Sequence, residues 1–153
     1  MSRNDGKEAE TLIRDCFEKL QMDANSTYVR LYDTTSAGAK GNFIPEQPAD
    51  FIIQYEGRAS LVEVKSSNVH TSLSKISLKG FITPSQLLGV RTWTRAKAKS
   101  FFIFYSITTK LFEFWKGEDI LSAIRDKRRV KKCSAIAIEV GKAELYTNLQ
   151  RLL

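Results

Sequence analysis

Two short apolar runs around a tight turn constrain the fold of this chain most strongly. Residues 51–55 read FIIQY, residues 59–65 read ASLVEVK, and Glu56-Gly57 lies between them. Short apolar runs on both sides of such a turn are typical of a β-hairpin. The sequence therefore predicts two paired strands in this region.

Three charged residues stand on this hairpin, where an unpaired buried charge would be costly. Residues two apart on a strand point to the same side, so Glu63 and Lys65 share one face and Val62 and Val64 share the other. Asp50 stands at the start of the first strand, which a hairpin brings near the end of the second. We therefore expect Asp50, Glu63 and Lys65 to converge at one end of the sheet.

Two carboxylates that lie close together repel each other unless a cation lies between them. Mg²⁺ suits such a site because it binds one or two carboxylates and keeps waters for phosphate oxygens. In phosphodiester hydrolysis the metal activates a water, and a nearby lysine can orient it or stabilise the transition state. The competing interpretation is an exposed strand whose Glu–Lys pair contributes almost nothing. We favour a Mg²⁺ site, in which Mn²⁺ can substitute.

The three residues resemble the signature of the PD-(D/E)xK nuclease superfamily, with Asp50, Glu63 and Lys65 at its signature positions. The order Pro48-Ala49-Asp50 departs from the family pattern, in which the proline directly precedes the aspartate. That proline has no chemical role, so the departure costs little. The resemblance implies a metal-dependent nuclease, with the Val64 carbonyl as a further metal ligand.

Two further stretches resemble Holliday-junction resolvases. GKEAETLIRDCFEKL is similar to the first helix of the archaeal Hjc type, which makes Glu10 a metal-site acid, with Glu8 as the alternative. SLSKISLKGFITPSQLLGVRTW resembles the bacterial RecU type, in which Gln86 belongs to the active site as an outer-shell or direct metal ligand. Ser85 replaces the usual histidine there. From periodicity alone, Glu10 is a solvated helix residue and Gln86 a polar residue in a first turn.

The order of the predicted elements indicates an α/β fold, a central mixed β-sheet flanked by helices with a restriction-endonuclease-like core. The chain of 153 residues suits one nuclease domain, with a core at about 6–115 and a C-terminal helix and strand within 117–153. Helices are predicted at 7–20, from Pro84 to about Ala98, and at 118–128. Further strands are predicted at 28–32, 101–107, 111–115 and 135–140.

A net charge of +7 favours a polyanionic partner, although many small proteins are basic for solubility alone. Arg91, Arg95 and Lys99 follow helical spacing and predict one cationic helix face. The predicted DNA-binding residues are Arg30, Ser36, Lys40, Lys79, Arg91, Arg95 and Lys99. The basic run 126–132 is equally consistent with DNA contact and with a solvated helix end, and the Ser-rich stretch 66–80 fits a loop, a dimer arm or a DNA wedge.

The resemblance to Holliday-junction resolvases implies a structure-specific endonuclease that cuts four-way DNA junctions as a homodimer. No sequence feature fixes the dimer surface, for which exposed apolar residues of 101–115 or of the last strand are the candidates. A restriction- or repair-type endonuclease of the same fold, or a non-catalytic basic DNA-binding protein, are the alternatives. We expect no membrane association and no small-molecule cofactor. Two motif-free cysteines without a secretion signal suggest free thiols and a cytoplasmic protein of cellular or viral origin.

Overall fold

The computed structural model describes residues 5–31 and 47–153, which form a six-stranded mixed sheet flanked by four helices. The strands lie in the order of the sequence, and all neighbours are antiparallel except β3 and β4. The predicted α/β class with a central mixed sheet is confirmed. The elements are α1 (Asp5–Asp23), β1 (Ser26–Arg30), β2 (Phe51–Tyr55), β3 (Arg58–Ser67), α2 (Pro84–Arg95), β4 (Lys99–Ser106), β5 (Leu111–Lys116), α3 (Gly117–Arg125), β6 (Ala137–Val140) and α4 (Lys142–Leu152), with 3₁₀ turns at Leu73–Lys75 and Lys132–Ser134.

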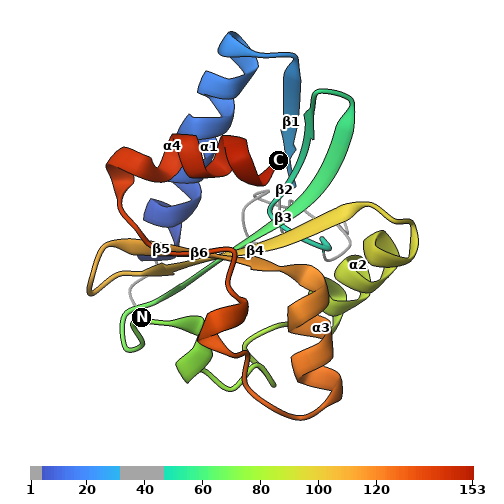
Figure 1. The fold of residues 1–153 in the computed structure, drawn as a ribbon, viewed down its shortest axis with the longest axis vertical. Coiled ribbons are helices and arrows are strands. Elements are labelled where there is room, and N and C mark those ends of the chain that lie inside the picture. Colours follow the sequence, from blue (N-terminus) through green and yellow to red (C-terminus); the bar gives the residue numbers. More distant parts are fainter. Residues whose placement is uncertain (1–4, 32–46) are drawn as a thin grey trace, which may run out of the picture.

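Each face of the sheet carries its own hydrophobic core. Helices α1 and α4 cover one face, and α2 and α3 lie on the other (Figure 1). Along β3, Val62 and Val64 point into the core under α1, as the alternation of a strand requires. Along β4, Phe102 and Phe104 point into the core under α2 and α3. Glu63 and Lys65 therefore lie on the α2 side of the sheet.

The β2–β3 hairpin is confirmed, with Phe51 opposite Val62 and Tyr55 opposite Arg58. The turn residues Glu56 and Gly57 have φ angles of 47° and 79°. Positive φ at both central positions matches the twist of the two strands. This register brings the residue before Phe51 to the level of Glu63, which is the placement that the site requires.

Two predicted helices end earlier than expected. Helix α2 ends at Arg95 and α3 at Arg125, and in both the chain then turns through a lysine at positive φ, Lys97 at 58° and Lys127 at 51°. The expectation that Lys99 continues the cationic face of α2 is wrong, because Lys99 begins β4. Arg91 and Arg95 are both exposed on that helix.

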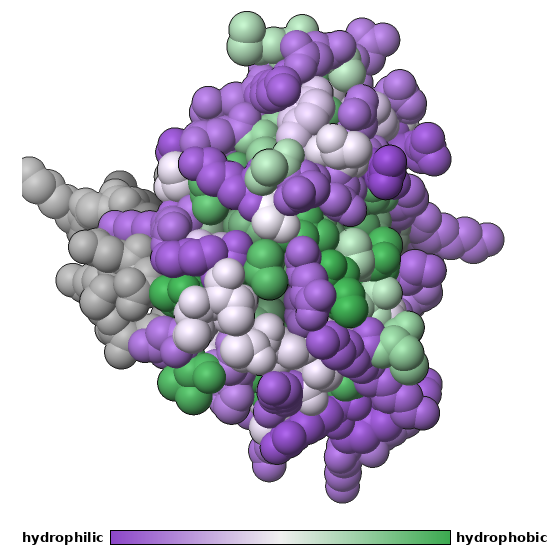
Figure 2. All heavy atoms as spheres, turned by 60° about the vertical axis from the view of Figure 1, so that its left-hand side comes forward, coloured by the Kyte–Doolittle hydropathy of each residue, from purple (hydrophilic) through white to green (hydrophobic). Residues whose placement is uncertain are grey.

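The expected interface on residues 101–115 is also wrong for its apolar side chains. Phe101–Tyr105, Phe112, Phe114 and Trp115 are all buried, because β4 and β5 lie inside the sheet. On the last strand Ile138 is 41% exposed, and its place in a dimer interface stays a prediction. On the side that carries α1 and α4, hydrophilic side chains dominate and apolar ones form small separate groups (Figure 2). Among the described residues on that side, Figure 2 shows no single large apolar patch.

The thiols and the lengths of the helices were also predicted from the sequence. Cys16 and Cys133 are both free thiols, as predicted, and burial raises the pKa of Cys16 to about 11. Among the described residues, no helix combines the length and the apolar composition needed to cross a bilayer.

Candidate active site

Asp50 is fixed against the backbone of β3. Its backbone N–H donates to the Val62 carbonyl at 3.2 Å, and its Oδ2 accepts from the Val64 N–H at 2.7 Å. The N–H and C=O of one strand residue point to the same side, so the Val64 carbonyl also faces Asp50. The carboxylate thus occupies the place where another strand residue would pair.

Glu63 lies at the centre of the site. It is 3% exposed, and its Oε1 lies 3.3 Å from Lys65 Nζ and accepts a hydrogen bond from Gln86 Nε2. Its other oxygen, Oε2, is buried and has no hydrogen-bond partner among the described residues. A buried carboxylate oxygen without a donor is costly and marks a place for a cation or an ordered water.

Both carboxylates hold protons more tightly than usual. Burial, followed by the charge of Glu10, raises the pKa of Asp50 to about 7, against the opposing Val64 N–H, Lys65 and Arg30. Burial, followed by the charge of Asp50, raises the pKa of Glu63 well above its ordinary value, against the opposing Lys65. One lysine therefore does not offset the cost of two ionised carboxylates, and a divalent cation would.

Helix α1 brings Glu10, rather than the alternative Glu8, towards this cluster. Glu10 pairs with Arg30 of β1, and both side chains are about one quarter exposed. Glu8 instead accepts from Tyr105 and Lys110 and ties α1 to the β4–β5 hairpin. Arg30 therefore offsets part of the charge of the third carboxylate, and its predicted role in DNA contact stays a prediction.

Gln86 is fixed by the first turn of α2. Its Oε1 accepts from the Thr83 N–H, the Thr83 hydroxyl accepts from the Gln86 N–H, and Pro84 occupies the first turn. This capping box leaves the amide nitrogen free to donate to Glu63. Because the amide oxygen is already engaged, the geometry places Gln86 as a partner that orients Glu63. Its role as a direct metal ligand stays a prediction.

Pro48 positions the Asp50 segment against α2, a role that sequence reasoning missed. A Cβ on Gly89 would lie 2.5 Å from Pro48 Cβ and 3.1 Å from its carbonyl oxygen. The Ser85 hydroxyl donates to the Gln47 carbonyl at 3.4 Å. The displaced proline therefore holds the strand start that carries Asp50, and a glycine within the helix was the signal for that close contact.

Gly89→Ala is expected to lower the free energy of unfolding by about 1–2 kcal/mol, because the rigid ring and backbone of Pro48 must move. Part of this destabilisation is offset, because alanine is more favourable than glycine within a helix by about 1 kcal/mol. Urea unfolding measures the effect. Leu88→Ala at the neighbouring position, where the side chain is 62% exposed, should change the stability by no more than about 0.5 kcal/mol. Equal stability of Gly89→Ala and the wild type would contradict this contact.

The donor set fits one hard divalent cation. Asp50 and Glu63 supply carboxylate oxygens, one of them buried and unpartnered, and the Val64 carbonyl faces the same side. Within residues 5–31 and 47–153, no three His, Cys, Asp or Glu side chains lie close enough to form a complete metal site. Mg²⁺ is bound through one or two carboxylates and keeps several waters, so two suffice.

The predicted DNA-binding residues are spread over the molecule. Ser36 and Lys40 lie outside the described residues. Lys79, Arg91 and Arg95 are exposed. The Lys99 amine donates to the Leu153 carbonyl at 3.2 Å, which ties β4 to the end of α4. DNA contact by each of these residues stays a prediction.

No protein-family model matches the chain, and no curated protein is detectably similar to it. Among solved structures, one match is Hjc, a Holliday junction resolvase from the archaeal hyperthermophile Archaeoglobus fulgidus. The identity is 14%, the TM-score is 0.44, and the match covers 71% of this chain and 77% of the other. At that distance the likeness decides neither the fold family nor the activity, which must be argued from the site itself.

Proposed function

We propose that this protein is a divalent-metal-dependent endonuclease that hydrolyses DNA phosphodiesters, with four-way junctions as its preferred substrate. The supporting observation is the cluster of Asp50, Glu63 and Lys65, in which the buried Glu63 Oε2 has no hydrogen-bond partner in the part of the chain that the structure describes. Placing two carboxylates and one lysine together costs stability, and the arrangement suits phosphodiester hydrolysis.

The residues have distinct roles in this proposal. Asp50 and Glu63 hold the cation together with the Val64 carbonyl, and Gln86 keeps Glu63 in its orientation. The bound ion supplies positive charge for a phosphate oxygen and lowers the pKa of water. Lys65, with its side chain 18% exposed, positions the attacking water or stabilises charge on the reacting phosphate.

The preference for junctions rests on the sequence resemblance of α1 and of the α2 region to resolvases. A four-way junction has two-fold symmetry, and paired cuts require two sites related by the same symmetry. We therefore propose a homodimer as the active form. The net charge of +7 supports binding to DNA through its phosphates.

Cleavage of a labelled four-way junction, beside a linear duplex of the same sequence, tests this function. We expect symmetric nicks in the junction with Mg²⁺ or Mn²⁺, slower cutting of the duplex, and no cutting in EDTA. Equal rates on both substrates would remove the junction preference and leave a restriction- or repair-type nuclease. A junction that stays intact with every divalent ion would overturn the proposed activity.

A further inference from the structure

A groove with a volume of about 910 Å³ lies between the segment that leads into α2 and the end of α3. One wall is the end of the Ser-rich stretch, Ser77 to Gly80, followed by the first turn of α2. The other wall is the end of α3 with the basic residues that follow it. The Ser-rich stretch and the basic run after α3 have no role in the proposed catalytic site, and both line this groove.

The rim of this groove is cationic. Lys79 stands on one wall and Lys127, Arg128 and Arg129 stand on the other, all of them exposed. No Asp or Glu belongs to the lining among the described residues. Arg128 pairs with Asp126 at 3.5 Å, which leaves Lys127 and Arg129 as the less compensated charges. Such a rim attracts an anionic chain.

The cations on the α3 wall are held in place at both ends. The Lys127 N–H donates to the Ile124 carbonyl and the Arg128 N–H to the Ala123 carbonyl, which closes the helix end. Val130, directly after the basic residues, is 3% exposed and anchors the chain in the core. The basic residues therefore form a fixed edge of the groove rather than a solvated tail.

The floor of the groove is apolar. Leu78, Ile82 and Ala123 are buried, and Leu87 and Ile124 are partly exposed at its surface. A DNA duplex presents mainly phosphates and base edges, because its base faces are stacked inside. An unpaired strand presents phosphates together with apolar base faces. A cationic rim over an apolar floor therefore suits an unpaired strand better than a duplex.

The groove and the candidate active site share the start of α2. Thr83 and Pro84 line the groove, and Gln86 in the same turn donates to Glu63. Phe81, between the groove residues Gly80 and Ile82, has its ring centroid 5.7 Å from Lys65 Nζ. The start of α2 and Phe81 therefore connect the groove to residues of the candidate active site.

We infer that this groove binds an unpaired DNA strand next to the cleavage site, which makes strand-separated DNA at a branch point the substrate class. This inference rests on the proposed nuclease function. It can be tested separately, because strand binding is measured without metal and therefore without cleavage. The groove would hold a few unpaired nucleotides, and the duplex arms would lie elsewhere on the basic surface.

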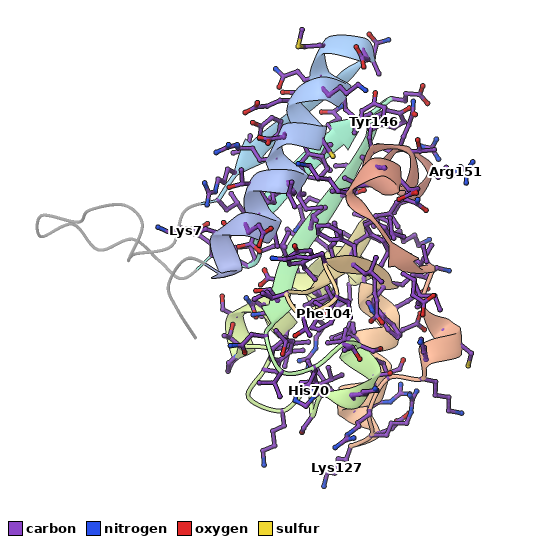
Figure 3. The ribbon with its side chains drawn as sticks, turned by 90° about the vertical axis from the view of Figure 1, so that its left-hand side faces the viewer. Lys7, His70, Phe104, Lys127, Tyr146 and Arg151 are labelled. Carbon is purple, nitrogen blue, oxygen red and sulfur yellow. The ribbon has the colours of Figure 1, made fainter. Side chains whose placement is uncertain are left out.

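The first test removes the two less compensated rim charges with Lys127→Gly and Arg129→Ala in one variant. Glycine suits position 127 because its φ is 51°, so the variant should fold at least as well as the wild type. Arg58→Ala with Lys142→Ala is the matched control, since it removes one exposed lysine and one exposed arginine outside the groove. Figure 3 shows Lys127 at the opposite end of the molecule from Tyr146 and Arg151 of α4, the helix that Lys142 begins.

Binding to labelled oligothymidine and to a blunt duplex of equal length is measured in EDTA over a series of salt concentrations. For the groove variant we expect at least a tenfold loss of oligothymidine affinity. The slope of log K against log salt should fall by about 1.4, or about 0.7 for each lost phosphate contact. The control should lose less than about threefold, and duplex binding should change less than strand binding in the groove variant.

A second variant tests the apolar floor without changing charge. Leu87→Ala should weaken oligothymidine binding about three- to tenfold and leave the salt slope unchanged, because it removes a base contact. Leu88→Ala, which alters a neighbouring side chain outside the lining, is its control.

Equal losses in the groove and control variants, or an equal loss of duplex and strand binding, would overturn the groove assignment. The outcomes also separate the two proposals. Strand binding through the groove by a protein that cuts nothing would support the groove and remove the nuclease. If the protein cuts junctions but its affinity for the unpaired strand is unchanged by these substitutions, the nuclease proposal is supported and the groove assignment is removed.

Discussion

Glu63→Gln is expected to lower the rate of metal-dependent DNA cleavage by about 10³-fold, with DNA affinity retained within about threefold. The amide keeps the shape of the side chain and can still accept from Gln86 and Lys65, so the fold should persist. The substitution removes the negative charge and replaces one carboxylate oxygen with an amide nitrogen. A hard cation binds through charged carboxylate oxygens, so metal binding should be lost. Loss of charge stabilisation at a reacting phosphate is worth about 10²–10³-fold or more.

Glu113→Gln is the matched control for this experiment. Glu113 is also a buried strand glutamate, but its Oε2 accepts from the Leu73 N–H and from Trp115 Nε1. An amide oxygen can accept both bonds, so cleavage should stay within about threefold of the wild type. Single-turnover cleavage with saturating protein measures both variants. Cutting by Glu63→Gln at the wild-type rate would show that Glu63 is not part of the site.

The metal-free protein is expected to lose stability as the pH rises from about 4 to about 7. Asp50 titrates near 3.8 when unfolded and near 7 when folded, so the folded state binds the extra proton between these values. Stability falls with pH wherever the folded state holds more protons. A rise of the Asp50 pKa from 3.8 to about 7 corresponds to at most about 4 kcal/mol, reduced by the solvent that reaches Asp50. The raised pKa of Glu63 acts in the same direction.

Asp50→Asn should therefore raise the melting temperature of the metal-free protein at pH 8. The amide can still accept from the Val64 N–H, and the repulsion with Glu63 disappears. A gain of about 2 kcal/mol corresponds to roughly 4–8 °C for a chain of this size. Thermal unfolding in EDTA from pH 4 to 8 measures the effect, and Mg²⁺ should stabilise the wild type at pH 8 but not this variant.

Asp126→Asn serves as the control for the pH series. Asp126 lies at the surface, and its hydrogen bond with Arg125 lowers its pKa, so the substitution should not stabilise the protein. A wild-type protein whose stability rises steadily with pH in EDTA would contradict the picture of two repelling carboxylates. So would a destabilised Asp50→Asn protein.

Local patterns in the sequence were sufficient for the hairpin and for the start of α2. The turn at Glu56-Gly57 and the period of two fix both the register and the face of Glu63. Thr83, Pro84 and Gln86 form the predicted start of α2 with a complete capping box. Such interactions involve residues a few positions apart, which is why a single sequence reveals them.

The ends of α2 and α3 were not visible in the sequence, for an identifiable reason. Both helices close with the hydrogen-bond pattern that usually places glycine at positive φ, and here lysines stand at those positions, Lys97 and Lys127. Because no glycine marks either helix end in the sequence, the predicted helices extended too far, and Lys99 was predicted to lie on a helix face. Helix α4 was not predicted, although Leu145, Leu149 and Leu152 have helical spacing and are buried.

Contacts between distant segments could not be read from local pattern. The pairing of Arg30 with Glu10 depends on how α1 packs against β1, and the contact of Pro48 with Gly89 depends on the path into β2. The contacts of Glu8 with Tyr105 and Lys110 likewise join segments that are distant in the sequence. These contacts decide which carboxylates remain available to a cation.

The most direct test of the metal site is the position of bound Mn²⁺, located by anomalous diffraction from a crystal of the wild-type protein. We predict a single strong peak between the carboxylates of Asp50 and Glu63, in contact with Glu63 Oε2, and its loss in Glu63→Gln. A well-ordered site without such a peak at saturating Mn²⁺, or a peak bound elsewhere with these carboxylates untouched, would contradict the account.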